Sequence, residues 1–165
     1  MHKRNELQRK IQAYIPLHGA RVSFIASFVM AVIVVRGVTA STVASVLNPK
    51  ALPESNEKRI KRFFGQVKLE GRGFARFMLA LLPNKDKLIL TLDRTTWELG
   101  SRCINILMLG VAYKGLAFPL LWVLLDKKGN SDTKERLALV DKVLTLVDAG
   151  DIEAIVADRE FTGKS

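Results

Sequence analysis

The chain of 165 residues contains one cysteine and two histidines, and these shortages exclude several kinds of site. Cys103 is alone, so the chain has no internal disulfide and no zinc site built on several cysteines. His2 and His18 have no further histidine or cysteine at metal-ligand spacing, which argues against a histidine metal site. This cysteine usage fits a reducing compartment, and we expect a cytoplasmic protein.

A long hydrophobic run is also lacking. The longest candidate, residues 22–35, is shorter than the roughly 20 apolar residues that a membrane-spanning helix needs. The first ten residues are too polar for a signal peptide, and no small-residue cleavage site follows them. We therefore expect no membrane as partner. Membrane association, through residues 22–35 and the apolar strands described below, is the weaker alternative.

Acidic residues are scarce in the first half of the sequence only. Residues 1–83 hold 14 lysines and arginines against 4 acidic residues, whereas residues 84–165 hold 12 of each. A basic module followed by a neutral one indicates that the first module binds a polyanion. Nucleic acid is the commonest such partner.

The basic module, residues 1–83, has the pattern of several short helices. Apolar periodic stretches are broken at turn signals, and residues 39–42 offer an N-cap to a short helix. Residues 54–64 predict a basic amphipathic helix with Ile60, Phe63 and Phe64 on its apolar face. This layout is typical of a helical DNA-binding module. The predicted DNA-binding residues are Lys58, Arg59, Lys61 and Arg62.

From residue 84 onward, the spacing of apolar residues changes from the helical pattern to short apolar runs typical of β-strands. Residues 88–98 predict a first strand, and residues 104–113 and 116–125 predict a hairpin around a tight turn. Pro119 lies in the third run and lacks a backbone N–H donor, so we expect this strand at the margin of the sheet.

A helix and a fourth strand complete the second module. Asp132 and Glu135 have capping-box spacing, and Gly150 is the predicted C-cap of the helix. The predicted apolar positions of this helix are Leu137, Val140, Leu144 and Val147. Residues 154–157 then form a short strand. The order of strand, strand, strand, helix, strand predicts a mixed α+β or α/β fold, βββαβ, for residues 84–165.

Two aspartates, Asp93 and Asp158, lie at the polar ends of the first and fourth predicted strands. On spacing alone, both could be ordinary exposed residues at strand ends. A right-handed crossover helix, however, returns the fourth strand parallel to the first, and the two aspartates converge if these strands are neighbours. Hard cations such as Mg²⁺ relieve the repulsion between two such carboxylates.

The sequence motifs around these two aspartates resemble those of a known protein family. Residues 92–97, Leu-Asp-Arg-Thr-Thr-Trp, and residues 157–163, Ala-Asp-Arg-Glu-Phe-Thr-Gly, resemble the first and second acidic motifs of DDE transposases from bacterial insertion sequences. The similarity extends through the intervening hairpin and helix and, more loosely, through residues 59–64. It implies a ribonuclease-H-like core that performs cut-and-paste transposition with Mg²⁺, for which Mn²⁺ can substitute.

By this resemblance Asp93 and Asp158 are metal ligands and catalytic residues. Arg159, Glu160 and Phe161 are their companions in the second motif, with roles that the sequence does not define. The implied partners are the double-stranded DNA of transposon ends and, in a full-length protein, further copies of the chain.

The family's third carboxylate, a glutamate with tyrosine, arginine and lysine around it, has no counterpart here. We therefore expect an incomplete core, truncated before the third acidic residue, and a chain that does not cleave DNA alone. The alternative function is that of an inactive transposase that acts only as a DNA-binding protein.

Overall fold

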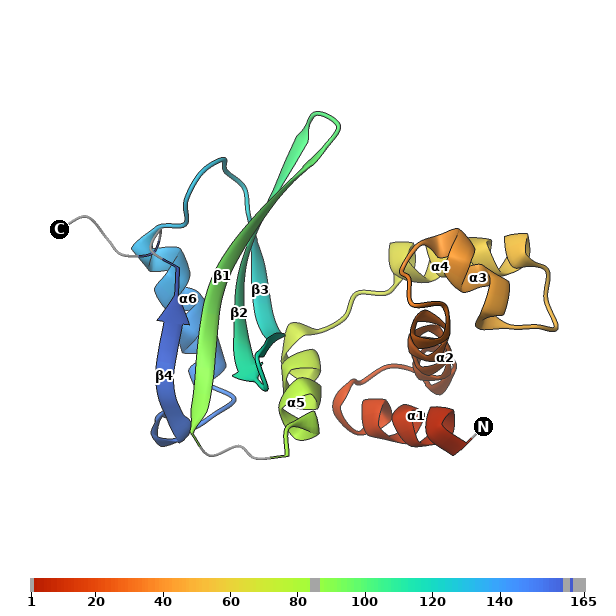
Figure 1. Cartoon of the computed structure of the whole chain (residues 1–165), viewed down its shortest axis with the longest axis horizontal. Coiled ribbons are helices and arrows are strands. Elements are labelled where there is room, and N and C mark those ends of the chain that lie inside the picture. Colours follow the sequence, from red (N-terminus) through yellow and green to blue (C-terminus); the bar gives the residue numbers. More distant parts are fainter. Residues whose placement is uncertain (1, 84–86, 159–160, 162–165) are drawn as a thin grey trace. The chain divides into compact units, whose positions relative to one another are not determined.

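The structure is a computed structural model that describes residues 2–83, 87–158 and 161 (Figure 1). The chain forms two compact units, Met1–Glu70 and Gly71–Ser165. Helix α5 (Gly71–Leu81) thus belongs to the second unit, although the sequence analysis grouped it with the module that ends at residue 83. The difference arises because α5 packs on the sheet and buries Ala75 and Leu79 in its core.

Four helices make up the described part of the first unit: α1 (His2–Tyr14), α2 (Gly19–Val35), α3 (Ala40–Leu47) and α4 (Pro53–Gln66). Helices α2, α3 and α4 share one apolar cluster, and α1 packs on α2 and buries Ile11. The buried members of the shared cluster are Phe24, Ala31, Val43, Ala44 and Ile60. The apolar run of residues 22–35 therefore supplies core side chains to this unit.

Helix α2 holds that whole apolar run. Among the described helices, none is by itself long and apolar enough to cross a membrane. Helices α2 and α3 together have the required length and composition, but they meet at a bend of 107°.

Local sequence signals determine where α3 and α4 begin. Helix α3 begins directly after Thr39, within the N-cap region that the sequence predicted, and α4 begins with Pro53, whose missing N–H costs nothing in a first turn. Ile60 is buried and Phe63 packs against the same apolar cluster, as predicted for the apolar face. Phe64 is 57% exposed but also packs against apolar neighbours, edge-on to Phe28 with ring centroids 5.2 Å apart.

The second unit contains α5, a four-stranded sheet and a further helix. Its elements after α5 are β1 (Leu88–Leu99), β2 (Arg102–Tyr113), β3 (Leu116–Leu125), α6 (Thr133–Leu144), a 3-10 turn (Ala149–Asp151) and β4 (Ile152–Ala157). The strand order is β3-β2-β1-β4; β1, β2 and β3 are antiparallel neighbours, and β4 is parallel to β1. The predicted meander, the parallel return and the marginal place of the Pro119 strand are thus confirmed, and the fold is mixed α+β.

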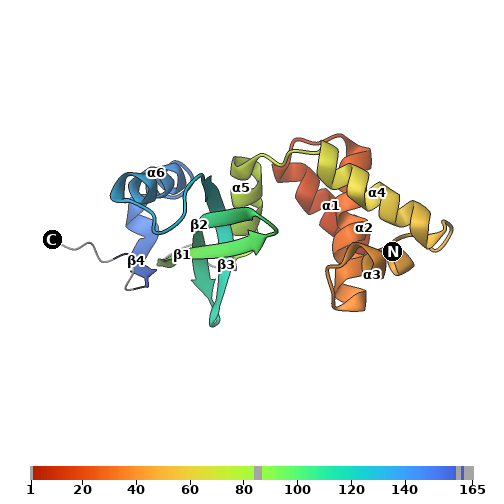
Figure 2. The ribbon, with the colours of Figure 1, turned by 90° about the horizontal axis from the view of Figure 1, so that it is seen from above.

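The sheet buries one face under α5 and α6, which lie on the same side of it (Figure 2). Leu90 and Leu92 of β1 point into this core together with Leu107 and Leu109 of β2. Because side chains alternate along a strand, Thr91 and Asp93 lie on the opposite face. Asp93 is therefore exposed on the solvent side of β1, directly after the buried Leu92.

Helix α6 begins with the predicted capping box. The backbone N–H of Glu135 donates to Asp132 Oδ1 at 2.9 Å, and the N–H of Asp132 donates to Glu135 Oε2 at 2.8 Å. These two bonds satisfy backbone donors that a helix start leaves without partners.

The predicted end of this helix and part of its predicted apolar face are wrong. Helix α6 ends at Leu144, and Gly150 lies in the 3-10 turn that precedes β4. The helix buries Leu139 and Val143 against the sheet, whereas Leu137 is 57% exposed. The apolar residues at the C-terminal side, including Val147, continue the core through a turn and not through further helix.

Candidate functional site

The pairing of β1 with β4 makes the two predicted aspartates neighbours at the point where β4 ends, while β1 continues past Asp93 to Leu99. The last paired residues of these parallel strands are Leu92 and Ala157, and Asp93 and Asp158 follow them directly. Neighbouring strands lie about 4.8 Å apart. The two acidic residues are therefore adjacent in space although 65 peptide bonds of chain separate residues 93 and 158, and both are exposed.

The carboxylate of Asp93 is oriented by the backbone beside it. Its Oδ1 atom accepts a hydrogen bond from the N–H of Arg94 at 2.8 Å. A hydrogen bond of this kind fixes one carboxylate oxygen and leaves the second for other partners. Asp93 thus presents an oxygen ligand on the solvent side of β1.

Arg94 connects this motif to the loop that follows β3. Its Nη1 donates to Thr96 Oγ1 at 2.8 Å, and its Nη2 donates to Asn130 Oδ1 at 3.1 Å. The same loop is held by the buried Asn105, whose Nδ2 donates to the carbonyl oxygens of Lys127 at 3.0 Å and Gly129 at 2.9 Å. Sequence reasoning missed Asn105, although a polar residue within an apolar strand was a visible signal.

The second motif is anchored through Phe161. The N–H of Phe161 donates to the carbonyl oxygen of Asp158 at 3.0 Å. The ring of Phe161 packs against the core of the second unit, and Arg136 of α6 donates from Nη1 to its carbonyl oxygen at 2.5 Å. Phe161 thus links the backbone carbonyl of Asp158 to Arg136 of α6. No sequence signal distinguished Arg136 from other basic residues on a helix.

Arg159 and Glu160, the other two companions in the second motif, lie outside the described residues. Within the part of the chain that is described, no group of three or more histidine, cysteine, aspartate or glutamate residues could hold a metal ion. The candidate site therefore consists of two carboxylates on neighbouring strands.

The four predicted DNA-binding residues have different surroundings on α4. Lys61 forms an ion pair with Glu57 at 2.7 Å, and Lys58 is exposed. The guanidinium of Arg59 lies 5.1 Å from the ring centroid of Phe24. Arg59 and Arg62 also line a common cavity of about 220 Å³, and they share it with Arg21 of α2. The structure thus places Arg59 and Arg62 at one cavity and pairs Lys61 with the carboxylate of Glu57.

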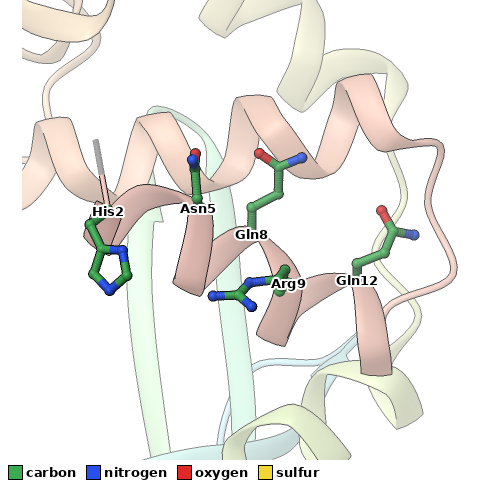
Figure 3. Close-up of a pocket in the computed structure, with 5 residues that line it drawn as sticks. All are labelled: His2, Asn5, Gln8, Arg9 and Gln12. Carbon is green, nitrogen blue, oxygen red and sulfur yellow. The ribbon is translucent and has the colours of Figure 1, made fainter.

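A polar row along α1 was not anticipated. Figure 3 shows five side chains that line a cavity, and all of them come from this helix. They are His2, Asn5, Gln8, Arg9 and Gln12. Gln12 donates from Nε2 to the carbonyl oxygen of Leu17 at 3.0 Å, which fixes the turn between α1 and α2. The row adds hydrogen-bonding groups to the basic unit.

Comparison with protein-family models, curated proteins and solved structures gives no match for this chain. The functional interpretation therefore depends on the motifs in the sequence and on the geometry of the two units.

Proposed function

We propose that this chain carries the DNA-binding module and the first two metal ligands of a DDE transposase of a bacterial insertion sequence. The observation that supports the proposal best is the parallel register of β1 and β4, in which Leu92 pairs with Ala157. This register makes Asp93 and Asp158 neighbours, as a shared metal site requires. The proposed core is ribonuclease-H-like, in keeping with the strand order β3-β2-β1-β4.

The two carboxylates suit Mg²⁺ or Mn²⁺. Mg²⁺ prefers oxygen ligands, keeps several waters and is commonly held by one or two carboxylates. Asp93 and Asp158 are exposed, so waters have access to the remaining coordination positions. When bound in such a site, divalent ions activate a water or a 3′-hydroxyl and stabilise the leaving oxygen of a phosphodiester.

The chain's own residues would orient these ligands. The N–H of Arg94 fixes one oxygen of Asp93, and Phe161 links the backbone carbonyl of Asp158 to Arg136. Precise orientation matters because a displacement of about 1 Å in such a site can cost roughly a hundredfold in rate.

The first unit would supply the affinity for DNA. Its excess of basic residues provides phosphate contacts, with Lys58, Arg59 and Arg62 as candidates and Lys61 weakened by its ion pair with Glu57. Binding through this unit alone is the second candidate function. It is favoured by the observation that the described residues contain no third carboxylate at the site.

One assay separates these two functions. Purified chain is incubated with Mg²⁺ or Mn²⁺ and a DNA substrate that contains the element's ends, beside an Asp93→Ala control. We expect binding without cleavage, because two aspartates alone do not complete the site. Cleavage that the control abolishes would contradict this expectation and would mean that another carboxylate, such as Glu160 or one from a second copy, completes the site.

A further inference from the structure

A cavity of about 430 Å³ in the first unit collects cationic side chains from separate elements. Arg4 comes from α1, Lys50 from the loop between α3 and α4, and Arg59 from α4. Ser23 and Ser27 of α2 add two hydroxyl groups to its wall. Residues 4 and 59 are far apart in sequence, so the fold itself creates this concentration of positive charge.

No acidic residue is among the side chains that line this cavity. Within the described part of the chain, Arg4, Lys50 and Arg59 form no ion pair, in contrast to Lys10, Lys61 and Lys127. In addition, the Nε–H of Arg4 is buried without an acceptor. Like charges held together without counter-charge raise the free energy of the folded state, and a bound anion would relieve that repulsion.

Arg59 also belongs to the smaller cavity that contains Arg21 and Arg62. Its guanidinium is kept between the two cavities by its contact with the ring of Phe24, which lines both. One arginine with a fixed, planar fork of donors can therefore serve two neighbouring anionic groups. A chain of linked anions fits this arrangement better than a single small ion.

We infer that the Arg4, Lys50 and Arg59 cavity binds a backbone phosphate of duplex DNA, and that the Arg21, Arg59 and Arg62 cavity binds a second phosphate nearby. Guanidinium and ammonium groups bind phosphate by charge-assisted hydrogen bonds, and the hydroxyl of Ser23 can donate to a remaining oxygen, whereas that of Ser27 donates to the carbonyl oxygen of Ser23 at 2.9 Å. This inference rests on the proposed function, because it specifies how the first unit contacts DNA. Arg4, Arg21 and Lys50 are new binding residues beside those predicted from the sequence.

The test measures the affinity of the full chain for a short duplex of arbitrary sequence by fluorescence anisotropy over a range of KCl concentrations. The test variant is Arg4→Gln combined with Lys50→Gln. The matched control is Lys10→Gln combined with Lys142→Gln, which removes the same charge from a lysine paired with Glu6 and from an exposed lysine of α6 in the second unit. Circular dichroism establishes that each variant retains its helices.

We expect the test variant to bind about tenfold more weakly, and its log-log salt slope to be smaller by about 0.9 for the one phosphate lost. The control should retain the slope of the unaltered chain. Equal slopes for test variant and control would overturn the inference. Competition with inorganic phosphate provides a second arm: if the test variant loses phosphate binding but keeps its DNA slope, the cavity holds a small anion and the DNA assignment is wrong.

The transposase proposal can fail independently of this result. Asp93→Asn and Asp158→Asn lie in the second unit, and we expect both variants to bind duplex DNA with an unchanged salt slope. A changed slope in the Arg4 and Lys50 variant, together with an absence of divalent metal binding, would retain the phosphate sites and remove the transposase proposal. An unchanged slope in that variant, together with intact metal binding, would remove the phosphate sites and retain the transposase proposal.

Discussion

The two units of this chain differ in how they use charge. The first unit, residues 1–70, holds 12 basic residues and 4 glutamates and has no aspartate, whereas all 8 aspartates lie in residues 71–165. Arg4, Lys50 and Arg59 line one cavity in the first unit, and in the second unit the register of β1 and β4 makes Asp93 and Asp158 neighbours. The two units therefore differ in the sign of the charged side chains that they bring together.

A buried asparagine shapes each unit. Asn56 of α4 donates from Nδ2 to the carbonyl oxygens of Ala44 at 3.0 Å and Asn48 at 3.1 Å, and so ties α4 to the end of α3. Asn105 of β2 ties the loop after β3 to the sheet in the same manner. Each unit thus has a buried asparagine that connects two of its segments. In the first unit it lies beside the Lys50 loop, and in the second it lies beside the Asp93 motif.

The largest effect that separates the units should come from their cores. Leu109→Ala removes a fully buried side chain from the sheet, and we expect it to lower the free energy of unfolding of the second unit by about 2–5 kcal/mol. Both tryptophans, Trp97 and Trp122, lie in this unit, so tryptophan fluorescence in a denaturant titration reports on it alone. The control Val43→Ala empties space in the first unit's core and should leave that transition in place. An equal shift with the control would show that the units unfold together.

The asparagines should have a somewhat smaller effect. Asn105→Ala leaves two carbonyl oxygens without a donor, and we expect a loss of about 1–3 kcal/mol in the second unit. Because the loop it holds also contacts Arg94, the substitution should weaken metal binding as well. Asn56→Ala should destabilise the first unit by a similar amount, measured by helical circular dichroism, without changing metal binding. Loss of metal binding in the Asn56 variant would contradict the assignment of sites to separate units.

A single glycine shows how tightly the second unit is packed. A Cβ at Gly110 of β2 would lie 2.7 Å from the carbonyl oxygen of Phe118 in β3, so Gly110→Ala should cost about 1–3 kcal/mol. Gly150→Ala is the matched control, since nothing lies within 4 Å of its added Cβ. We expect its unfolding transition to coincide with that of the unaltered chain or to shift slightly upwards. Equal losses in both variants would argue against the close contact between β2 and β3.

The smallest expected effect concerns pH. The N–H of Glu135, with further help from Lys127, holds the pKa of Asp132 below its ordinary value. A carboxyl whose pKa is lowered by folding adds stability above its unfolded pKa, near 3.9, and loses that contribution as the pH falls through the lower folded value. Asp132→Asn keeps a capping side chain but does not titrate, so its melting temperature should fall less between neutral pH and about pH 3. Asp148→Asn, at a residue without a capping bond, is the control.

The strand order could be predicted because its signals are local: the alternation in β1, the tight turn before β3 and Pro119 at the sheet margin. The parallel direction of β4 followed from a right-handed crossover, whereas the adjacency of β1 and β4 stayed a condition that only the folded structure meets. The end of α6 could not be predicted, because Gly150 is a frequent helix terminator and the bond of Thr145 that ends the helix earlier has no distinct sequence pattern.

The residues that hold the two candidate sites in place could not be predicted from the sequence, for a different reason. Arg136, Asn130 and Lys50 act through contacts with residues many positions away, and each is an unremarkable polar residue where it stands in the sequence. Only the folded arrangement shows that the first two hold the acidic motifs and that the third joins a cationic cavity.

The central claim is that Asp93 and Asp158 bind one divalent ion together. It is tested most directly by titrating Mn²⁺ into the full chain, with calorimetry as the readout, and comparing Asp93→Asn, Asp158→Asn and the double variant with Asp148→Asn as control. If the account is correct, each single variant at the site weakens binding by about tenfold or more, the double variant is little worse than either single one, and the control binds as the unaltered chain does. Binding that survives in both single variants at the affinity of the control would contradict it.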